Sequence, residues 1–380
     1  MYEAYQNYCT ELHRTGRYRK LPDVNLGLEL LDFSTNDYLG MSQSKGVLEA
    51  AKAAGDQFGV GATGSRLLSG NKKIFEDLEH LIAKDKGTES ALILNSGFQA
   101  NVTVLSSLLD ASVLGERPLV FFDKYNHASL YQGVFLSRAE LVRYAHNDMQ
   151  HLSHLLHQHK QDPRPKFIVT ETVFGMDGDC VALQEIVSLA RQHHAFLYLD
   201  DSHGTGVMGQ SGYGVSTDVD LAGTPHVIMG TLSKALGGFG AYIACAVALK
   251  NYIINKSPGF IYATALPPMV IGAAQKAWDT VRHLGDQRQE LMQKAEYLRS
   301  ELKSMGLNTG ASNTHIIPII LEKEDIVMEA RDRLLRQGVV VSAVRPPTVP
   351  SHTARLRIAL TVHHTYEEIS YLVSCVRSFL

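Results

Sequence analysis

The sequence lacks several features that would place it in a specialised class of protein. It has only four cysteines, which lie far apart and never as a CxxC pair, so neither a disulfide framework nor a structural zinc site is indicated. Its formal net charge of −3 gives no electrostatic support for nucleic-acid binding. No apolar run approaches the roughly 18 residues of a membrane span, and the polar first residues do not resemble a signal peptide. We therefore expect a cytoplasmic protein without a membrane segment.

Length and composition are typical of a globular enzyme. The chain has 380 residues, of which 45% are hydrophobic and 20% charged, and this length is too great for one simple core. We expect an N-terminal helix and arm over residues 1–40, a large domain over 41–268 and a smaller α+β domain over 269–380. No internal repeat or low-complexity segment suggests another division.

Short apolar runs alternate with helical or loop stretches between residues 90 and 245. This alternation indicates βαβ units and a mainly parallel sheet. Polar residues cluster where the runs end, and an open α/β sheet binds its ligand at that edge. The expected strands are Ala91–Asn95, Leu119–Asp123, Phe167–Glu171, Phe196–Asp200, Val227–Gly230 and Ala241–Cys245.

The flanking parts of the chain predict helices and a second, smaller sheet. Amphipathic patterns over 45–58 and 72–86 predict two helices, and the glycine-rich stretch 59–70 between them predicts a loop. Residues 269–305 predict one long helix, and a closing helix is expected from Thr365. The C-terminal strands are expected over Thr314–Leu321, Gly338–Val344 and Arg355–Leu360.

Two strand ends in the large domain carry the most informative side chains. Asp200 closes one apolar strand, and Lys234 follows Thr231 in a glycine-rich turn after the next. A pyridoxal phosphate site needs an Asp to keep the pyridine nitrogen protonated and a Lys to hold the cofactor as a Schiff base. Burial lowers the pKa of such a lysine and makes its amine nucleophilic. A turn aspartate and a surface lysine are the alternative interpretations.

Three more candidates follow strand ends. His203 stands in the turn after Asp200, where it would contact the phenolic oxygen of the cofactor or serve structure alone. Gly97 lies where a strand gives way to a helix, and its backbone could approach a phosphate at the helix N-terminus. His127 follows another strand, and its ring could stack on a pyridine ring or be an ordinary loop histidine.

Several other histidines could be mistaken for ligands. Four of them between residues 151 and 159 have near-helical spacing, but leucines form the opposite stripe and no acidic cluster or HExxH motif accompanies them. A solvated helix face is the favoured interpretation, and we expect no metal site. The pairs at 193–194 and 363–364 are likewise expected at the surface.

Six short motifs extend over nearly the whole chain, and they are Asn36–Gly40, Gly64–Gly70, Asp123–Ser129, Glu171–Gly178, Asp200–Gly206 and Thr231–Lys234. Together they resemble the α-oxoamine synthase family of fold-type I pyridoxal phosphate enzymes, over residues 30–378. The resemblance implies a large α/β domain with a mainly parallel, seven-stranded type of sheet and a smaller α+β domain. It also implies homodimers with active sites at the subunit interface, where the loop 261–268 would complete the neighbour's phosphate site.

The resemblance implies a role for each cofactor residue. Lys234 would carry the cofactor and move the substrate α-proton, and Asp200 would hold the pyridinium. His127 would stack on the ring, and His203 would contact its O3′. The phosphate would be bound by backbone groups of Gly97 and Phe98, with Thr231.

The resemblance also implies substrate residues and one departure. Arg357 would fork onto the amino-acid carboxylate with help from Asn36. The family usually has a serine whose hydroxyl reaches the cofactor at the position of Gly175, and its loss would cost about 0.5–1.5 kcal/mol. The residues expected to face the acyl thioester are Arg19, Arg345 and Thr348.

Two stretches bear on the substrates. Ala145–Asp148 and Val344–Pro350 resemble the branch of the family that condenses L-alanine with a pimeloyl thioester in biotin synthesis. The acyl carrier is left open between coenzyme A and an acyl carrier protein. One alternative is a glycine-dependent member of the 2-amino-3-ketobutyrate or 5-aminolevulinate synthase type. Another is a cofactor-free, inactive partner subunit, against which the presence of Lys234 counts.

Overall fold

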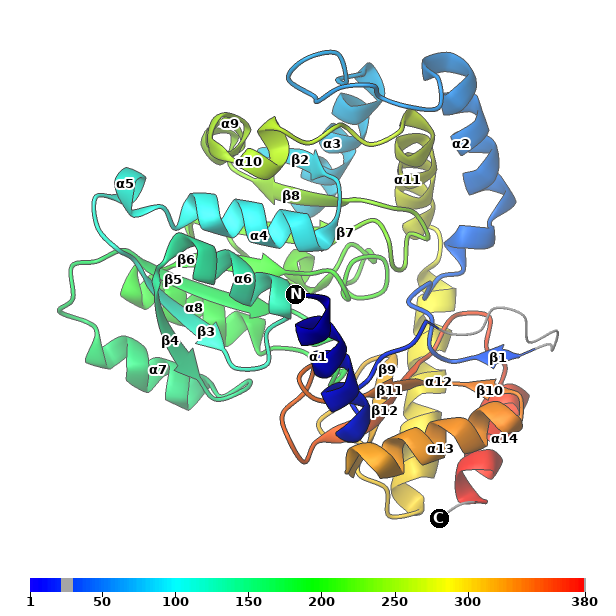
Figure 1. The fold of residues 1–380 in the computed structure, drawn as a ribbon. Helices are drawn as coiled ribbons and strands as arrows, with labels where there is room; N and C mark the ends of the chain where they lie inside the picture. The colour runs from blue at the N-terminus through cyan, green and yellow to red at the C-terminus, as the bar shows by residue number, and fades with distance from the viewer. Residues whose placement is uncertain (22–29, 379–380) are drawn as a thin grey trace. The chain divides into compact units, whose positions relative to one another are not determined.

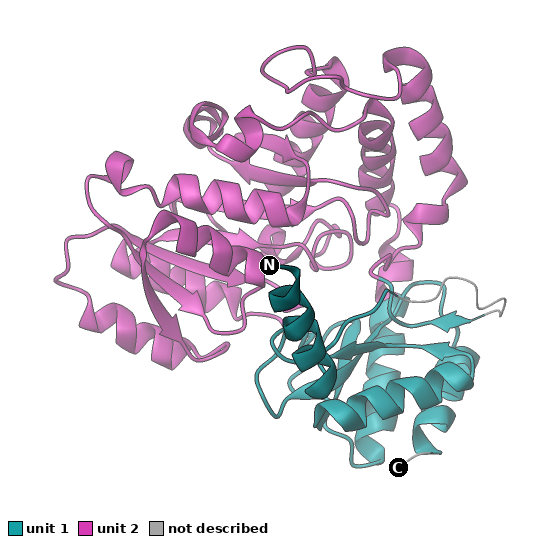
Figure 2. Ribbon diagram, viewed as in Figure 1, with its two compact units in different colours: residues 1–35, 176–179, 290–380 teal, residues 36–175, 180–289 magenta. Residues whose placement is uncertain are grey.

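The computed structural model describes residues 1–21 and 30–378. These divide into two compact units (Figure 2). Unit 1 comprises residues 1–35, 176–179 and 290–380, and unit 2 comprises 36–175 and 180–289. No helix among the described residues is long and apolar enough to cross a membrane.

A seven-stranded sheet forms the centre of unit 2 (Figure 1), in the order β2-β8-β7-β6-β5-β3-β4. Strand β8 runs antiparallel to both of its neighbours, and the ladder from β7 to β4 is parallel throughout. The mainly parallel sheet predicted from the alternating runs is therefore confirmed. The strands are β2 (Ser90–Leu94), β3 (Leu119–Asp123), β4 (Glu140–Tyr144), β5 (Lys166–Glu171), β6 (Phe196–Asp200), β7 (His226–Thr231) and β8 (Ala241–Cys245).

Strand β4 is absent from the six predicted strands. It lies at the edge of the sheet, paired with β3 alone, and four of its five residues keep contact with solvent. Its sequence Glu-Leu-Val-Arg-Tyr is accordingly not a continuous apolar run. Six strands were visible in the sequence because burial made them apolar, among them β2 at the opposite edge, and β4 was not visible because it is only half buried.

Helices of unit 2 pack against one another and against the sheet. Helix α4 packs against α6, and α2 packs against α11. Side chains from α4 and from the inner strands, among them Leu105, Phe122 and Tyr198, form a fully or almost fully buried core. The helices are α2 (Lys45–Phe58), α3 (Lys73–Lys86), α4 (Gly97–Leu108), α5 (Ala111–Leu114), α6 (Ala128–Ser137), α7 (Met149–Gln158), α8 (Leu183–His193), α9 (Val247–Lys256), α10 (Pro258–Ile261) and α11 (Pro268–Val281), with 3-10 turns at Met41–Gln43 and Val215–Asp218.

The long helix predicted over 269–305 is wrong, because two helices occupy this stretch. Helix α11 ends at Val281, and α12 (Gly285–Ser304) begins after a short turn. The amides of His283 and Leu284 bond to carbonyls three residues back, at 2.9 and 3.1 Å, which tightens the chain into that turn. The apolar periodicity continues through it, so the sequence pattern did not reveal it.

Unit 1 contains a three-stranded antiparallel sheet in the order β11-β12-β9. Its strands are β9 (Ile316–Glu322), β11 (Ser342–Val344) and β12 (Ala354–Ala359). A short parallel pair joins β1 (Leu31–Asp32) to β10 (Val339–Val340), and the helices of this unit include α1 (Tyr2–Arg14), α13 (Glu324–Arg336) and α14 (Tyr366–Arg377). Thr365 caps α14 in a capping box with Glu368, as the predicted closing helix requires.

Two histidines expected at the surface are buried. His193 ends α8 and His364 precedes α14, and they are 9% and 7% exposed. The His364 ring stacks on Phe33 with centroids 4.1 Å apart, and its Nε2 lies 3.1 Å from the carbonyl oxygen of Asp32. Their neighbours His194 and His363 are exposed as expected. Burial of one member of each pair depends on packing partners that are distant in sequence.

Candidate active site

The carboxyl ends of the parallel strands of unit 2 bring the candidate cofactor residues to one edge of the sheet. Asp200 is the last residue of β6 and Thr231 the last of β7, which is its hydrogen-bonded neighbour. Glu171 ends β5 and lies opposite Asp200 in register. A ligand site at this edge is the ordinary consequence of an open α/β sheet.

The carboxylate of Asp200 is held by neutral donors. Its side chain is buried, its Oδ2 accepts from Nδ2 of Asn101 at 2.8 Å, and its Oδ1 accepts from the amide of Ser202 at 3.0 Å. Asn101 is fixed in turn by the hydroxyl of Tyr198, which donates to its Oδ1 at 2.9 Å. A buried carboxylate in such a setting is stabilised further by a cationic N–H group, so the position fits a pyridinium.

Glu171 was not among the predicted site residues, although it belongs to the Glu171–Gly178 motif. Burial raises its pKa well above the ordinary value, and the negative charge of Asp200 raises it further, against opposing effects of Lys234 and of backbone N–H groups. One of those groups is the amide of His127, which donates to Oε1 at 2.6 Å. Burial and the neighbouring Asp200 thus favour the protonated form of Glu171 more than water does.

His127 caps the N-terminus of α6 and carries a neutral ring. Partial desolvation by its surroundings lowers its pKa, the charge of Asp200 opposes this effect, and the amine of Lys234 reinforces it. Its Nδ1 lies 2.7 Å from the hydroxyl of Ser129, which fixes the ring orientation. The structure thus brings His127, Asp200, Glu171 and Lys234 into one electrostatic neighbourhood, and Lys234 itself stays partly exposed.

His203 is 9% exposed and lies against two residues of the predicted motifs. Its Nδ1 is 2.7 Å from the hydroxyl of Tyr38, which is fully buried and donates to Oδ1 of Asn36 at 3.0 Å. On its other side the ring abuts Gly175. Asn36, Gly175 and His203 are therefore joined around one imidazole, and Tyr38 is a member of the site that the sequence did not identify.

The start of α4 and the end of β7 form a candidate phosphate cradle. Gly97 is the first residue of α4 and closely approaches Thr231, because a Cβ at this position would lie 2.5 Å from Cγ2 of Thr231. The hydroxyl oxygen of Thr231 is buried and has no hydrogen-bond partner within the described parts of the chain. A phosphoryl oxygen would satisfy that hydroxyl and could accept from amides of the helix N-terminus. The side chain of Phe98, the next residue of α4, is 55% exposed.

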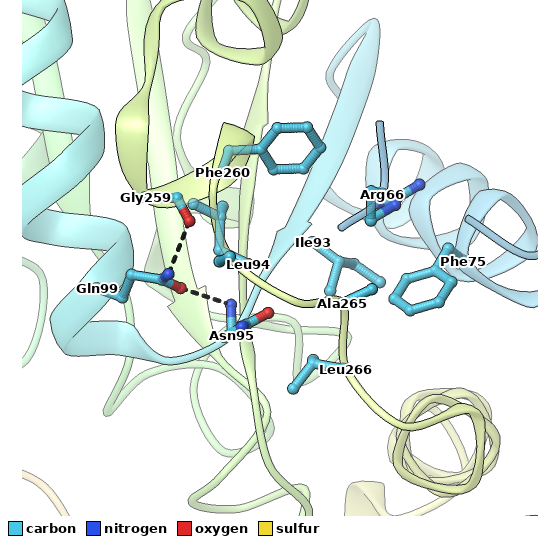
Figure 3. Close-up of a pocket in the computed structure, with 11 residues that line it drawn as sticks. Arg66, Phe75, Ile93, Leu94, Asn95, Gln99, Gly259, Phe260, Ala265 and Leu266 are labelled. Atoms are coloured by element: carbon cyan, nitrogen blue, oxygen red, sulfur yellow. Dashed lines mark hydrogen bonds between the residues drawn. The ribbon is translucent and has the colours of Figure 1, made fainter. Parts of the chain in front are cut away.

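Side-chain hydrogen bonds fix this helix start against the loop after α10 (Figure 3). Gln99 accepts from the amide of Asn95 at 2.9 Å and donates to the carbonyl of Gly259 at 2.7 Å. Asn95 donates to the carbonyl of Thr264 at 2.7 Å. A small pocket lies beside these bonds, bordered by Arg66, whose guanidinium stacks over Phe75 at 4.5 Å. The cradle is therefore set in place without a ligand.

The predicted substrate arginines all belong to unit 1. Arg19 donates to the hydroxyl of Thr348 at 3.0 Å, and Arg345 donates to the carbonyl of Gly16. Burial lowers the pKa of Arg345, and the positive charges of Arg331 and Arg19 lower it further. These contacts bring Arg19, Arg345 and Thr348 together as an electropositive group.

Arg357 lies elsewhere in unit 1, on β12, and is 4% exposed. Burial lowers the pKa of His315 to about 3, and the charges of Arg357 and Arg299 add to this effect. His315 consequently stays neutral beside the two guanidinium groups. Arg355, two residues earlier on the strand, is paired with Asp177.

Comparison with known proteins identifies the class. The family model of aminotransferase class I and II matches residues 29–376, and the chain belongs to this family. Within it, the chain is 41% identical over 382 residues to a protein of Magnetococcus marinus named "Putative 8-amino-7-oxononanoate synthase", with 98% of this chain and 96% of the relative covered. A Bacillus cereus protein of the same name is 40% identical over 378 residues, with 97% and 94% covered.

Solved structures support the same assignment. Serine palmitoyltransferase of Sphingomonas wittichii superposes with a TM-score of 0.87 and 30% identity, covering 93% of this chain and 88% of that one. 8-Amino-7-oxononanoate synthase of Francisella tularensis gives a TM-score of 0.79 at 28% identity, covering 92% and 97%. The chain is thus a pyridoxal phosphate-dependent acyltransferase of fold type I, among the α-oxoamine synthases, which confirms the predicted family, fold class and cofactor.

Proposed function

We propose that the enzyme condenses L-alanine with a pimeloyl thioester, with loss of carbon dioxide and of the thiol, to give 8-amino-7-oxononanoate for biotin synthesis. Relatives of that name at 40–44% identity support the proposal, as do the stretches Ala145–Asp148 and Val344–Pro350. The observation that carries the chemistry is that Asp200 and Lys234 both lie close enough to the ring of His127 to interact with it electrostatically. That juxtaposition is what a pyridoxal phosphate site requires.

Pyridoxal phosphate, when bound, supplies an electron sink for a carbanion at the α-carbon of the amino acid. The side chains present fit this group. Lys234 would hold it through its amine and then move the α-proton of alanine, and Asp200 would keep the proton on the ring nitrogen. The neutral ring of His127 would stack on the pyridine, and His203 would face its O3′. The phosphate would be bound by Gly97 and Phe98 amides and the Thr231 hydroxyl.

The raised pKa of Glu171 is compatible with this division of work. Glu171 lies opposite Asp200 in register, and burial together with the Asp200 charge favours its protonated form. Glu171 would support the site through the backbone amide of His127, which it accepts at Oε1. Asp200 would hold the proton on the ring nitrogen.

The substrates would be recognised by the residues predicted from the family motifs. Arg357 offers a planar pair of donors that suits the alanine carboxylate, and Asn36 would assist it. The electropositive group of Arg19, Arg345 and Thr348 would face the acyl thioester. Either coenzyme A or an acyl carrier protein could present that thioester.

The enzyme would act as a homodimer with active sites at the subunit interface. Several large hydrophobic side chains of unit 2 are exposed, among them Tyr262 and Leu68, each 83% exposed. Tyr262 lies in the loop 261–268, which would complete the neighbour's phosphate site. Sedimentation of the purified enzyme tests this part, and a monomer at micromolar concentration would contradict it.

The decisive test is a panel of amino acids and acyl donors. L-alanine, glycine and L-serine are each supplied with pimeloyl, acetyl, succinyl and palmitoyl thioesters, and the pimeloyl group is offered on coenzyme A and on a carrier protein. We expect turnover with L-alanine and a pimeloyl donor. Turnover confined to glycine and a short acyl donor, or to L-serine and palmitoyl thioester, would overturn the assignment.

A further inference from the structure

The imidazole of His203 occupies the space that a side chain at position 175 would need. A Cβ built on Gly175 would lie 2.3 Å from Nε2 of His203 and 2.9 Å from both Cδ2 and Cε1. Real contacts of this kind are not found below 3.0 Å, so any other residue would displace the ring. The backbone of Gly175 is not in the left-handed region, so a glycine is needed here for room and not for conformation.

The ring is tethered on its opposite side. Nδ1 lies 2.7 Å from the hydroxyl of Tyr38, which has no exposed surface. The same hydroxyl donates to Oδ1 of Asn36 at 3.0 Å, so Tyr38 is itself held in place. A shift of the ring away from position 175 would strain or break this buried bond, whose loss leaves a polar group unsatisfied.

We propose that Gly175 and Tyr38 form a two-sided clamp that sets the position of the His203 ring. The hydrogen bond to Tyr38 fixes Nδ1 of the ring, and the absence of a side chain at position 175 leaves the space that Nε2 occupies. The inference rests on the proposed contact between His203 and the cofactor, and it makes Gly175 and Tyr38 positioning residues that act through the imidazole. The difference between Gly175 and the family's usual serine is therefore not only the lost hydroxyl, because the His203 ring occupies the space that a serine side chain would need.

A double-mutant cycle on cofactor affinity tests the clamp. Gly175→Ala should raise the Kd of pyridoxal phosphate on the order of tenfold when Tyr38 is present, because the ring cannot yield. In the Tyr38→Phe background the untethered ring can move, so the same substitution should raise the Kd by less than about threefold. Equal effects in the two backgrounds would overturn the proposal. Gly285→Ala is the matched control, since a Cβ there meets nothing within 4 Å.

Two further measurements separate the clamp from misfolding and from the choice of substrate. Adding Gly175→Ala to His203→Ala should leave the Kd unchanged, because the colliding ring is gone, and an additional loss would contradict the clamp. A crystal structure of the Gly175→Ala apoenzyme should show the His203 ring displaced and its bond to Tyr38 lengthened, and an unmoved ring would refute it. All these readouts remain valid if the enzyme proves to use another amino acid or acyl donor.

Discussion

Glu171 and Asp200 end adjacent parallel strands and face each other in register, so two carboxyl groups share one buried edge of the sheet. Burial and the charge of Asp200 both raise the pKa of Glu171 above its ordinary value. Its Oε1 accepts the amide of His127, and Asp200 accepts from Asn101 and Ser202. The two carboxyl groups are therefore held by different donors at the same edge of the sheet.

The first prediction concerns the pH dependence of stability. Because the pKa of Glu171 is raised above its ordinary value of 4.5 in the folded state, folding takes up a proton, and stability falls as pH rises above about 4.5. Glu171→Gln removes this contribution. The difference in free energy of unfolding between variant and wild-type apoenzyme should therefore shift in favour of the variant as the pH rises above 4.5, as urea titrations would measure. A difference that is constant with pH would mean that Glu171 ionises normally.

The second prediction concerns the cofactor lysine. Lys234→Ala should abolish the visible absorbance of bound pyridoxal phosphate and lower turnover by at least about 10³-fold, since both the covalent link and the proton carrier are lost. Lys84→Ala on the exposed face of α3 is the control and should keep both. Unaltered absorbance in Lys234→Ala would place the cofactor on another amine.

The sequence predicted the parts of the fold whose signals are local. Asp200 and Thr231 could be assigned to strand ends because apolar runs precede them, and Gly97 could be assigned to a helix start because a strand comes before it. The edge strand β4 was missed because its partial exposure interrupts the apolar run, and the break between α11 and α12 was missed because the apolar periodicity continues through the short turn.

The contacts of the candidate site were less accessible from sequence. The raised pKa of Glu171 depends in part on its register with Asp200, and the importance of Tyr38 depends on a bond across 165 positions of the chain to His203. The departure at Gly175 looked like the loss of one hydrogen bond, whereas the structure shows its space filled by a ring. Such relationships arise from tertiary contacts that no local pattern records.

The third prediction separates two neighbouring aspartates. Asp200→Asn should raise the Kd of pyridoxal phosphate about 10- to 100-fold, because an amide cannot give the charge-assisted bond to a cationic N–H group. The thermal unfolding midpoint of this apoenzyme should fall only modestly, because the amide keeps one of the two hydrogen bonds from Asn101 and Ser202 and breaks no ion pair. Spectroscopic titration and calorimetry measure the two effects.

Asp201→Asn should instead lower the stability of the apoenzyme strongly and change the Kd of pyridoxal phosphate little. Its Oδ2 lies 2.8 Å from Nζ of Lys86, both side chains are fully buried, and Ser216 and Thr172 also donate to it. Breaking a buried ion pair on one side costs about 3–5 kcal/mol, because the remaining charge is left unpaired. A stable Asp201→Asn protein with impaired cofactor binding would contradict the assignment of these two roles.

The last prediction follows from the hydroxyl of Thr231, which is buried and unpartnered among the residues that the structure describes. In the apoenzyme the Thr231 hydroxyl is removed from water and gains no hydrogen bond in exchange. Thr231→Val removes this unfavourable contribution, so the free energy of unfolding of the apoenzyme should stay the same or rise. The same change should raise the Kd of pyridoxal phosphate about 3- to 10-fold, because one phosphate donor is lost. Thr172→Val is the matched control: its hydroxyl donates to the Asp201 carboxylate, so its loss should lower stability. If Thr231→Val destabilised the apoenzyme as Thr172→Val does, the hydroxyl would have a structural partner and the phosphate cradle would need another donor.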